Sequence, residues 1–174
     1  MVTLLLIFLL SVNEFGAFYT LKDLPENLQY RFYKICAEWN LEIPKGEVLI
    51  YETQSLKEFQ KITSKTYTIG GLYSKGVIIT QPFVILKRKG LLEKIIIHEL
   101  LHWVFQKNYR LPKWFEEGFI MMVLKINPQS LKGFHKLCLE KFIKEVKYED
   151  IRLYIDSHRI SCDRRNDKSF DASH

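Results

Sequence analysis

Three polar residues, His98, Glu99 and His102, interrupt an otherwise apolar run of the chain in the order H-E-x-x-H. Residues four apart on an α-helix lie on one face, about 6 Å apart, so both imidazoles can bind a single metal ion. Glu99 follows His98 and can accept a proton from a water activated for attack on a carbonyl carbon. As ordinary core residues, the three would form a costly polar cluster among isoleucine and leucine side chains. We therefore predict a metal site with Glu99 as its general base.

A metal site that acts on a substrate needs a third protein ligand and an open coordination position. Two candidates, Glu116 and Glu117, follow downstream in the sequence WFEEGF. Adjacent helical residues differ by about 100° in direction, so only one of them can point at the metal. Spacing alone does not choose between them.

The sequences HELLH at 98–102 and LPKWFEEGF at 111–119 resemble the gluzincin branch of zinc metallopeptidases, the peptidase MA-like group. In that group the helix with HExxH is followed by a proline, a tryptophan and a W-x-x-E-G motif whose glutamate completes the metal site. The resemblance covers roughly residues 18–124. It implies that Glu117 is the third ligand to one Zn²⁺ ion and that Glu116 is a surface charge.

The same resemblance implies where a substrate would bind. In such enzymes an edge strand holds an extended substrate by main-chain hydrogen bonds. The corresponding segment is 71–80, and its substrate-binding candidates are Gly71, Tyr73, Val77 and Ile79. Gluzincins also use a tyrosine or histidine of the C-terminal part to stabilise the oxyanion. The candidates, which spacing does not rank, are His135, Tyr148, Tyr154 and His158.

Hydrophobic periodicity and turn residues predict the elements that position these side chains. Expected helices cover 25–40, 55–62 with Ser55 as N-cap, a buried central segment from Gly90 to Phe105, 112–124, 129–146 and 149–157. Expected extended segments cover 47–52, 76–80 and 83–86, with Pro82 between the last two. We therefore predict an α+β fold with a helical C-terminal part. The resemblance implies a zincin-like fold, with a small mixed sheet whose edge strand lies over the metal-binding helix.

Length and composition bound the organisation of the chain. It has 174 residues, 47% of them hydrophobic, which suits one globular domain over 18–160 and excludes a disordered class. Residues 161–174 are polar and expected to be flexible. The net charge of +6 is dispersed, with no basic block interleaved with aromatic residues, so we expect no nucleic-acid partner.

The first 17 residues are read as a signal peptide or another hydrophobic N-terminal segment. The apolar run from Val2 to Val12 is too short for a spanning helix, which needs about 20 residues. Its length suits a signal peptide, although it lacks basic side chains and cleavage after Ala17 would place Phe15 where a small residue is favoured. A buried strand or a truncated anchor helix is the alternative. We expect export or membrane association through this segment, and a cytoplasmic location stays open.

The three cysteines, Cys36, Cys138 and Cys162, are far apart and odd in number. They form neither a metal-binding pair nor a disulfide framework, so structural roles are expected.

The predicted function is a zinc-dependent peptidase, more specifically an endopeptidase, acting on a peptide or protein substrate. The alternative is a zinc-binding domain that recognises extended peptides but hydrolyses them weakly or not at all.

Overall fold

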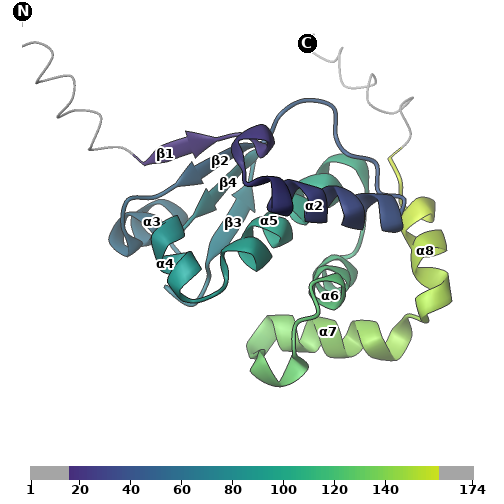
Figure 1. Ribbon diagram of the computed structural model, residues 1–174. Coiled ribbons are helices and arrows are strands. Elements are labelled where there is room, and N and C mark those ends of the chain that lie inside the picture. Colours follow the sequence, from purple (N-terminus) through teal and green to yellow (C-terminus); the bar gives the residue numbers. More distant parts are fainter. Residues whose placement is uncertain (1–15, 161–174) are drawn as a thin grey trace, which may run out of the picture. The chain divides into compact units, whose positions relative to one another are not determined.

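The structure, a computed structural model, describes residues 16–160. Over these residues it contains seven α-helices, three short 3₁₀-helices and a four-stranded mixed sheet (Figure 1). The predicted α+β class is confirmed. The proposed signal segment, apart from its last two residues, and the tail 161–174 lie outside the described residues. Between residues 16 and 160, no helix has both the length and the apolar character needed to cross a bilayer.

The chain divides into two compact units. Of the described residues, 16–35 and 45–103 belong to the first unit, and 36–44 and 104–160 belong to the second. The first unit contains the whole sheet. Two of the three divisions fall within continuous helices, α2 (Glu26–Glu38) and α5 (Leu92–Asn108), and the third falls between Pro44 and Lys45.

The sheet of the first unit has the strand order β1-β2-β4-β3. Its strands are β1 (Ala17–Tyr19), β2 (Leu49–Glu52), β3 (Gly71–Ser74) and β4 (Val77–Thr80). β2 and β4 are parallel, whereas β1 pairs with β2 and β3 with β4 in antiparallel fashion. The small mixed sheet is confirmed, and β1 and β3 form its edges.

The prediction of a single edge strand over 71–80 is wrong, because this segment folds into the hairpin β3–β4. Lys75 and Gly76 both have positive φ, 49° and 90°. A two-residue turn with positive φ at both positions matches the twist of the flanking strands. β4 consequently lies inside the sheet.

The four predicted substrate-binding residues therefore lie in two different strands. Val77 and Ile79 lie in β4, which is hydrogen-bonded to β2 on one side and to β3 on the other. No main-chain edge of β4 is therefore open to a guest strand. Gly71 and Tyr73 lie in β3, at the edge.

The prediction of an extended segment at 83–86 is also wrong, because these residues begin the helix α4 (Phe83–Arg88). Pro82 occupies the N-cap position, and the N–H of Phe83 donates to the Glu52 Oε1 of β2 at 2.6 Å. A carboxylate at a helix N-terminus is favourable. This tertiary contact overrides the β-propensity of the sequence FVIL.

The remaining helices of the first unit follow the predictions closely. α2 forms within the predicted range, and Ser55 caps α3 (Leu56–Thr63) by accepting the N–H of Glu58 at 3.1 Å. The predicted central helix is α5. Two residues just before His98 and two residues between Glu99 and His102 have no exposed surface: Ile96, Ile97, Leu100 and Leu101. This helix is buried on several faces, as its apolar sequence predicts.

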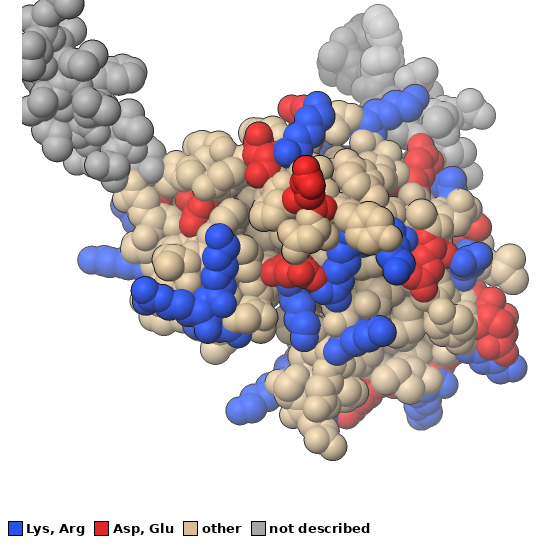
Figure 2. Space-filling view, in the orientation of Figure 1, with Lys and Arg blue, Asp and Glu red and all other residues tan. Residues whose placement is uncertain are grey.

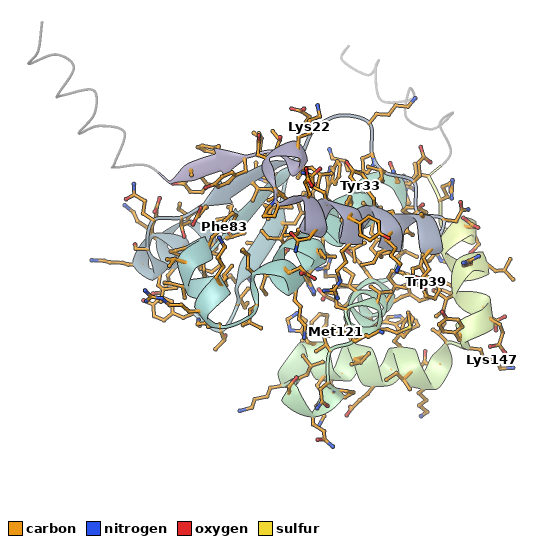
Figure 3. All side chains as sticks on the ribbon, viewed as in Figure 1. Lys22, Tyr33, Trp39, Phe83, Met121 and Lys147 are labelled. Atoms are coloured by element: carbon orange, nitrogen blue, oxygen red, sulfur yellow. The ribbon has the colours of Figure 1, made fainter. Side chains whose placement is uncertain are left out.

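The second unit contains three further α-helices, α6 (Lys113–Val123), α7 (Gly133–Glu145) and α8 (Ile151–Ser157). The predicted continuous helix over 129–146 is interrupted, since a 3₁₀-turn covers Pro128–Ser130 and α7 begins at Gly133. Aromatic rings fill the interior, and Trp39 meets Phe119 edge-on with ring centroids 5.2 Å apart. Figure 3 labels Trp39 and Met121 among these helices.

Gly118 of α6 lies against α7 with no room for a side chain. A Cβ atom there would be 2.3 Å from Phe142 Cβ and 3.0 Å from the carbonyl oxygen of Cys138. We expect Gly118→Ala to lower the free energy of unfolding by about 1–3 kcal/mol, measured by urea denaturation. Helix propensity alone predicts a gain of about 1 kcal/mol for the same change, so a stabilised variant would contradict the packing explanation.

Acidic side chains accompany basic ones on the surface. Ion pairs join Lys22 to Glu47, Lys136 to Glu140 and Lys141 to Glu145. On the face shown in Figure 2, lysine and arginine are interspersed with aspartate and glutamate. The positive charge is therefore as dispersed on this face as it is in the sequence.

Candidate metal centre

Helix α5 brings His98 and His102 together, as their spacing predicts. Their Nε2 atoms are 3.0 Å apart, and the ring planes make an angle of 78°. Two facing nitrogen lone pairs at this distance repel each other unless a proton or a cation lies between them. Two nitrogens bound to one tetrahedral zinc ion lie about 3.3 Å apart, so the observed separation fits shared binding.

Glu117 of α6 completes a group of possible ligands. His98, His102 and Glu117 each offer one ligand atom, and these atoms all lie within 4.8 Å of one another. Two imidazole nitrogens and one carboxylate oxygen form a donor set that suits zinc. The three residues predicted as ligands can therefore hold a divalent metal ion.

Both glutamates of α6 are buried, so the prediction that Glu116 is a surface charge is wrong. Glu116 is 5% exposed, Gln106 Nε2 lies 3.5 Å from its Oε1, and Lys113 Nζ lies 3.7 Å from its Oε2. The same Lys113 Nζ lies 3.2 Å from Glu117 Oε1. All residues of α6 from Phe115 to Met121 are buried, including both glutamates. The ammonium group of Lys113 partly offsets the charge of the two carboxylates.

The role of Lys113 was not predicted from the sequence. Its ammonium group lies three residues before Glu116 and four before Glu117, spacings that place side chains together on a helix surface. This spacing is the signal that could have identified the contact.

Glu99, the predicted general base, is buried and contacts the edge of the sheet. It is 5% exposed, and its Oε2 accepts the backbone N–H of Tyr73 at 2.7 Å. Glu99 does not belong to the group of possible metal ligands, and its carboxylate contacts the strand β3. No sequence pattern predicted its contact with β3.

The four oxyanion candidates have different surroundings. His135 Nε2, on α7, lies 3.6 Å from Glu117 Oε2. Tyr148 is 66% exposed and packs edge-on against Trp39. Tyr154 stacks on the ring of Phe115. Of these contacts, that of His135 is the one with a proposed metal ligand.

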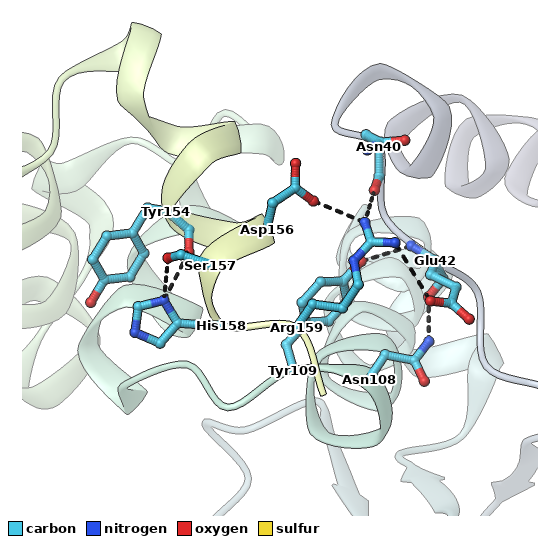
Figure 4. A network of polar contacts seen from close by, with 9 residues as sticks. All are labelled: Asn40, Glu42, Asn108, Tyr109, Tyr154, Asp156, Ser157, His158 and Arg159. Atoms are coloured by element: carbon cyan, nitrogen blue, oxygen red, sulfur yellow. Dashed lines mark hydrogen bonds and ion pairs between the residues drawn. The ribbon is translucent and has the colours of Figure 1, made fainter. Parts of the chain in front are cut away.

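Tyr154 and His158 belong to a polar network at the end of the described chain (Figure 4). His158 Nδ1 lies 2.8 Å from the carbonyl oxygen of Tyr154, and the rings stack with centroids 4.4 Å apart. Next to them, Arg159 donates to the carbonyl oxygen of Asn40 at 3.2 Å and to Asp156 Oδ1 at 2.9 Å. These contacts hold the C-terminal helix within the second unit.

Cys36 and Cys138 are free and buried, as their predicted structural roles require. Burial raises the pKa of the Cys36 thiol to about 12 and also raises the pKa of Cys138. A protonated thiol is neither a nucleophile nor a metal ligand. The third cysteine, Cys162, lies outside the described residues.

Comparison of the chain with protein-family models, with curated proteins and with solved structures finds no match. The resemblance to gluzincins thus rests on the two motifs themselves.

Proposed function

We propose that the chain is a zinc-dependent endopeptidase of the gluzincin type with a zincin-like fold. One observation carries the proposal: ligand atoms of His98, His102 and Glu117 lie within 4.8 Å of one another. The buried carboxylate of Glu99, next to His98 on α5, adds a proton acceptor. A metal-binding group with an adjacent general base is an arrangement that supports metal-assisted hydrolysis of an amide.

The donor set assigns a role to each ligand. His98, His102 and Glu117 would hold one Zn²⁺ ion and leave a coordination position open. When bound, the ion would polarise a substrate carbonyl and make a water acidic enough to lose a proton near neutral pH.

Glu99 would carry the proton through the reaction. Its carboxylate accepts a proton from the attacking water while the water oxygen bonds to the carbonyl carbon. The same proton then passes to the amide nitrogen as the carbon–nitrogen bond breaks, which yields a carboxylate and an amine. Since Oε2 already accepts the N–H of Tyr73, we assign the proton transfer to Oε1.

The substrate would be a peptide in extended form along the edge strand β3. Gly71 and Tyr73 belong to this strand, and Tyr73 also contacts Glu99. Main-chain pairing with a strand edge depends weakly on side chains, so we expect cleavage of varied sequences. Val77 and Ile79 would act by supporting β3 from the interior strand.

His135 is the oxyanion candidate that we favour. It lies beside Glu117, whereas Tyr154 and His158 are stacked on each other in the C-terminal network. An imidazole N–H directed at the developing charge would stabilise the intermediate.

The test is a metal analysis and a cleavage assay on the purified full-length chain. We expect about one zinc ion per chain and hydrolysis of a mixed peptide pool, detected by mass spectrometry, that stops with a chelator and returns with added zinc. Bound zinc without any cleavage would contradict the peptidase and favour the zinc-binding domain that recognises extended peptides. A chain that binds no zinc near stoichiometry would overturn both.

A further inference from the structure

We propose that Gly71 and the backbone N–H of Tyr73 are positioning elements that hold the Glu99 carboxylate in place. The inference rests on the proposed function, in which Glu99 is the general base. It assigns to the edge strand a role besides substrate binding.

The hydrogen bond from Tyr73 fixes one oxygen of Glu99. The N–H of Tyr73 donates to Glu99 Oε2 at 2.7 Å, although Tyr73 pairs with Ile78 of β4 in the sheet register. In an antiparallel pair, residues alternate between directing their main-chain groups at the partner strand and away from it. Tyr73 therefore directs its N–H away from β4, where it meets the carboxylate. A donor on a sheet backbone is rigid, and its bond to a charged acceptor is strong.

Gly71 provides the space in which this carboxylate lies. A Cβ atom at residue 71 would be 3.0 Å from Glu99 Cγ and 3.3 Å from Glu99 Oε1. Gly71 is not among the glycines with positive φ, so its backbone conformation does not require glycine. The requirement arises from the close approach of two side chains, Ile95, whose Cγ2 would lie at 2.9 Å, and Glu99. A methyl group there would push the Glu99 side chain away from its observed position.

The contact also limits how a substrate can pair with β3. A guest strand that used the N–H of Tyr73 would have to displace Glu99 from it. The substrate would therefore pair through the main chain of Gly71, which in the alternating pattern faces the same edge as Tyr73. The edge strand would thus orient both the base and the peptide on which it acts.

Gly70 offers a matched control. A Cβ atom at residue 70 would meet Ile95 at 2.8 Å and Leu86 at 3.3 Å, and a Cβ atom at residue 71 would also meet Ile95, at 2.9 Å. Both substitutions to alanine thus disturb the packing of the strand on Ile95. Glu99 is among the three nearest contacts for residue 71 but not for residue 70.

The contact can be tested without metal or substrate. In the metal-free full chain, NMR would follow hydrogen exchange of the Tyr73 amide in the wild type, Glu99→Ala, Gly71→Ala and Gly70→Ala. We expect exchange about 10- to 100-fold faster in Glu99→Ala and Gly71→Ala, and unchanged in Gly70→Ala. Undiminished protection in Glu99→Ala, or equal losses in the two glycine variants, would overturn the inference. Should Gly71→Ala fail to fold, the comparison of wild type with Glu99→Ala still decides it.

Kinetics then separates positioning from folding. With zinc content unchanged, Gly71→Ala should lower kcat about 100-fold with little change in KM, because a small displacement of a reacting group costs this much. Gly70→Ala should keep most of the wild-type kcat. A Gly71→Ala variant with wild-type kcat would refute the positioning role. If the wild-type chain cleaves no peptide, the proposed function fails, while the amide exchange still decides whether β3 holds Glu99.

Discussion

Replacement of Glu99 by glutamine should lower kcat for peptide hydrolysis by about 10²- to 10⁴-fold, the usual contribution of a general acid–base group. Glutamine has nearly the same size, and its amide oxygen can still accept the N–H of Tyr73. Its side chain cannot take a proton from water near neutral pH. Since Glu99 is outside the group of metal ligands, zinc content should stay at the wild-type level. The measurements are kcat on a peptide that the wild type cleaves and zinc content of both proteins.

The matched control is Glu93→Gln on the same helix. Glu93 forms an ion pair with Arg31, and its side chain is 37% exposed. Removing its charge should leave hydrolysis unchanged and alter the free energy of unfolding by about 1 kcal/mol or less. Full activity of Glu99→Gln would exclude Glu99 as the base. Loss of zinc from Glu99→Gln would instead make Glu99 a ligand.

Local sequence signals predicted the part of the site that lies on one helix. The 98–102 spacing places two imidazoles together because helix geometry depends on neighbouring residues alone. Ser55 was identified as an N-cap for the same reason, and its bond from Glu58 is present. Such features need no knowledge of the rest of the chain.

The errors concern contacts between residues far apart in the sequence. α4 begins where Glu52 of β2 accepts the N–H of Phe83. The two residues are 31 positions apart, and the apolar sequence FVIL does not predict this contact. The hairpin β3–β4, in contrast, has a local signal in the sequence, because Lys75-Gly76 between two apolar runs is typical of a turn. The contact of Glu99 with Tyr73 joins positions 26 apart, and no local pattern predicts it.

The two glutamates of α6 show the limit of spacing arguments. Helix geometry predicts that only one of them can face a metal, but it does not say which. The choice of Glu117 came from the resemblance, and Glu117 is the glutamate that groups with the two histidines. The other glutamate is buried together with its neighbours on α6, Phe115–Met121, and the charged pair in the sequence does not indicate this burial.

Glu117→Ala should weaken zinc binding by more than about 100-fold, whereas Glu116→Ala should weaken it by about tenfold or less. Removing a ligand costs more than removing a group that only supports the ligands, for which about 10- to 100-fold is typical. We place the loss of affinity for Glu116→Ala in the lower part of that range, because Glu116 lies farther from Lys113 Nζ than Glu117 does, 3.7 Å against 3.2 Å. Titration of the metal-free variants with zinc against a competing chelator measures both affinities.

The adjacency of the two residues makes the comparison strict. They are the same residue type on the same helix, 5% and 4% exposed, and both approach the ammonium group of Lys113. Effects of lost charge and lost packing should therefore be similar in the two alanine variants, and the difference in zinc affinity isolates coordination. Equal losses of affinity would mean that Glu117 acts on the site only through charge. A larger loss for Glu116→Ala would reverse the ligand assignment.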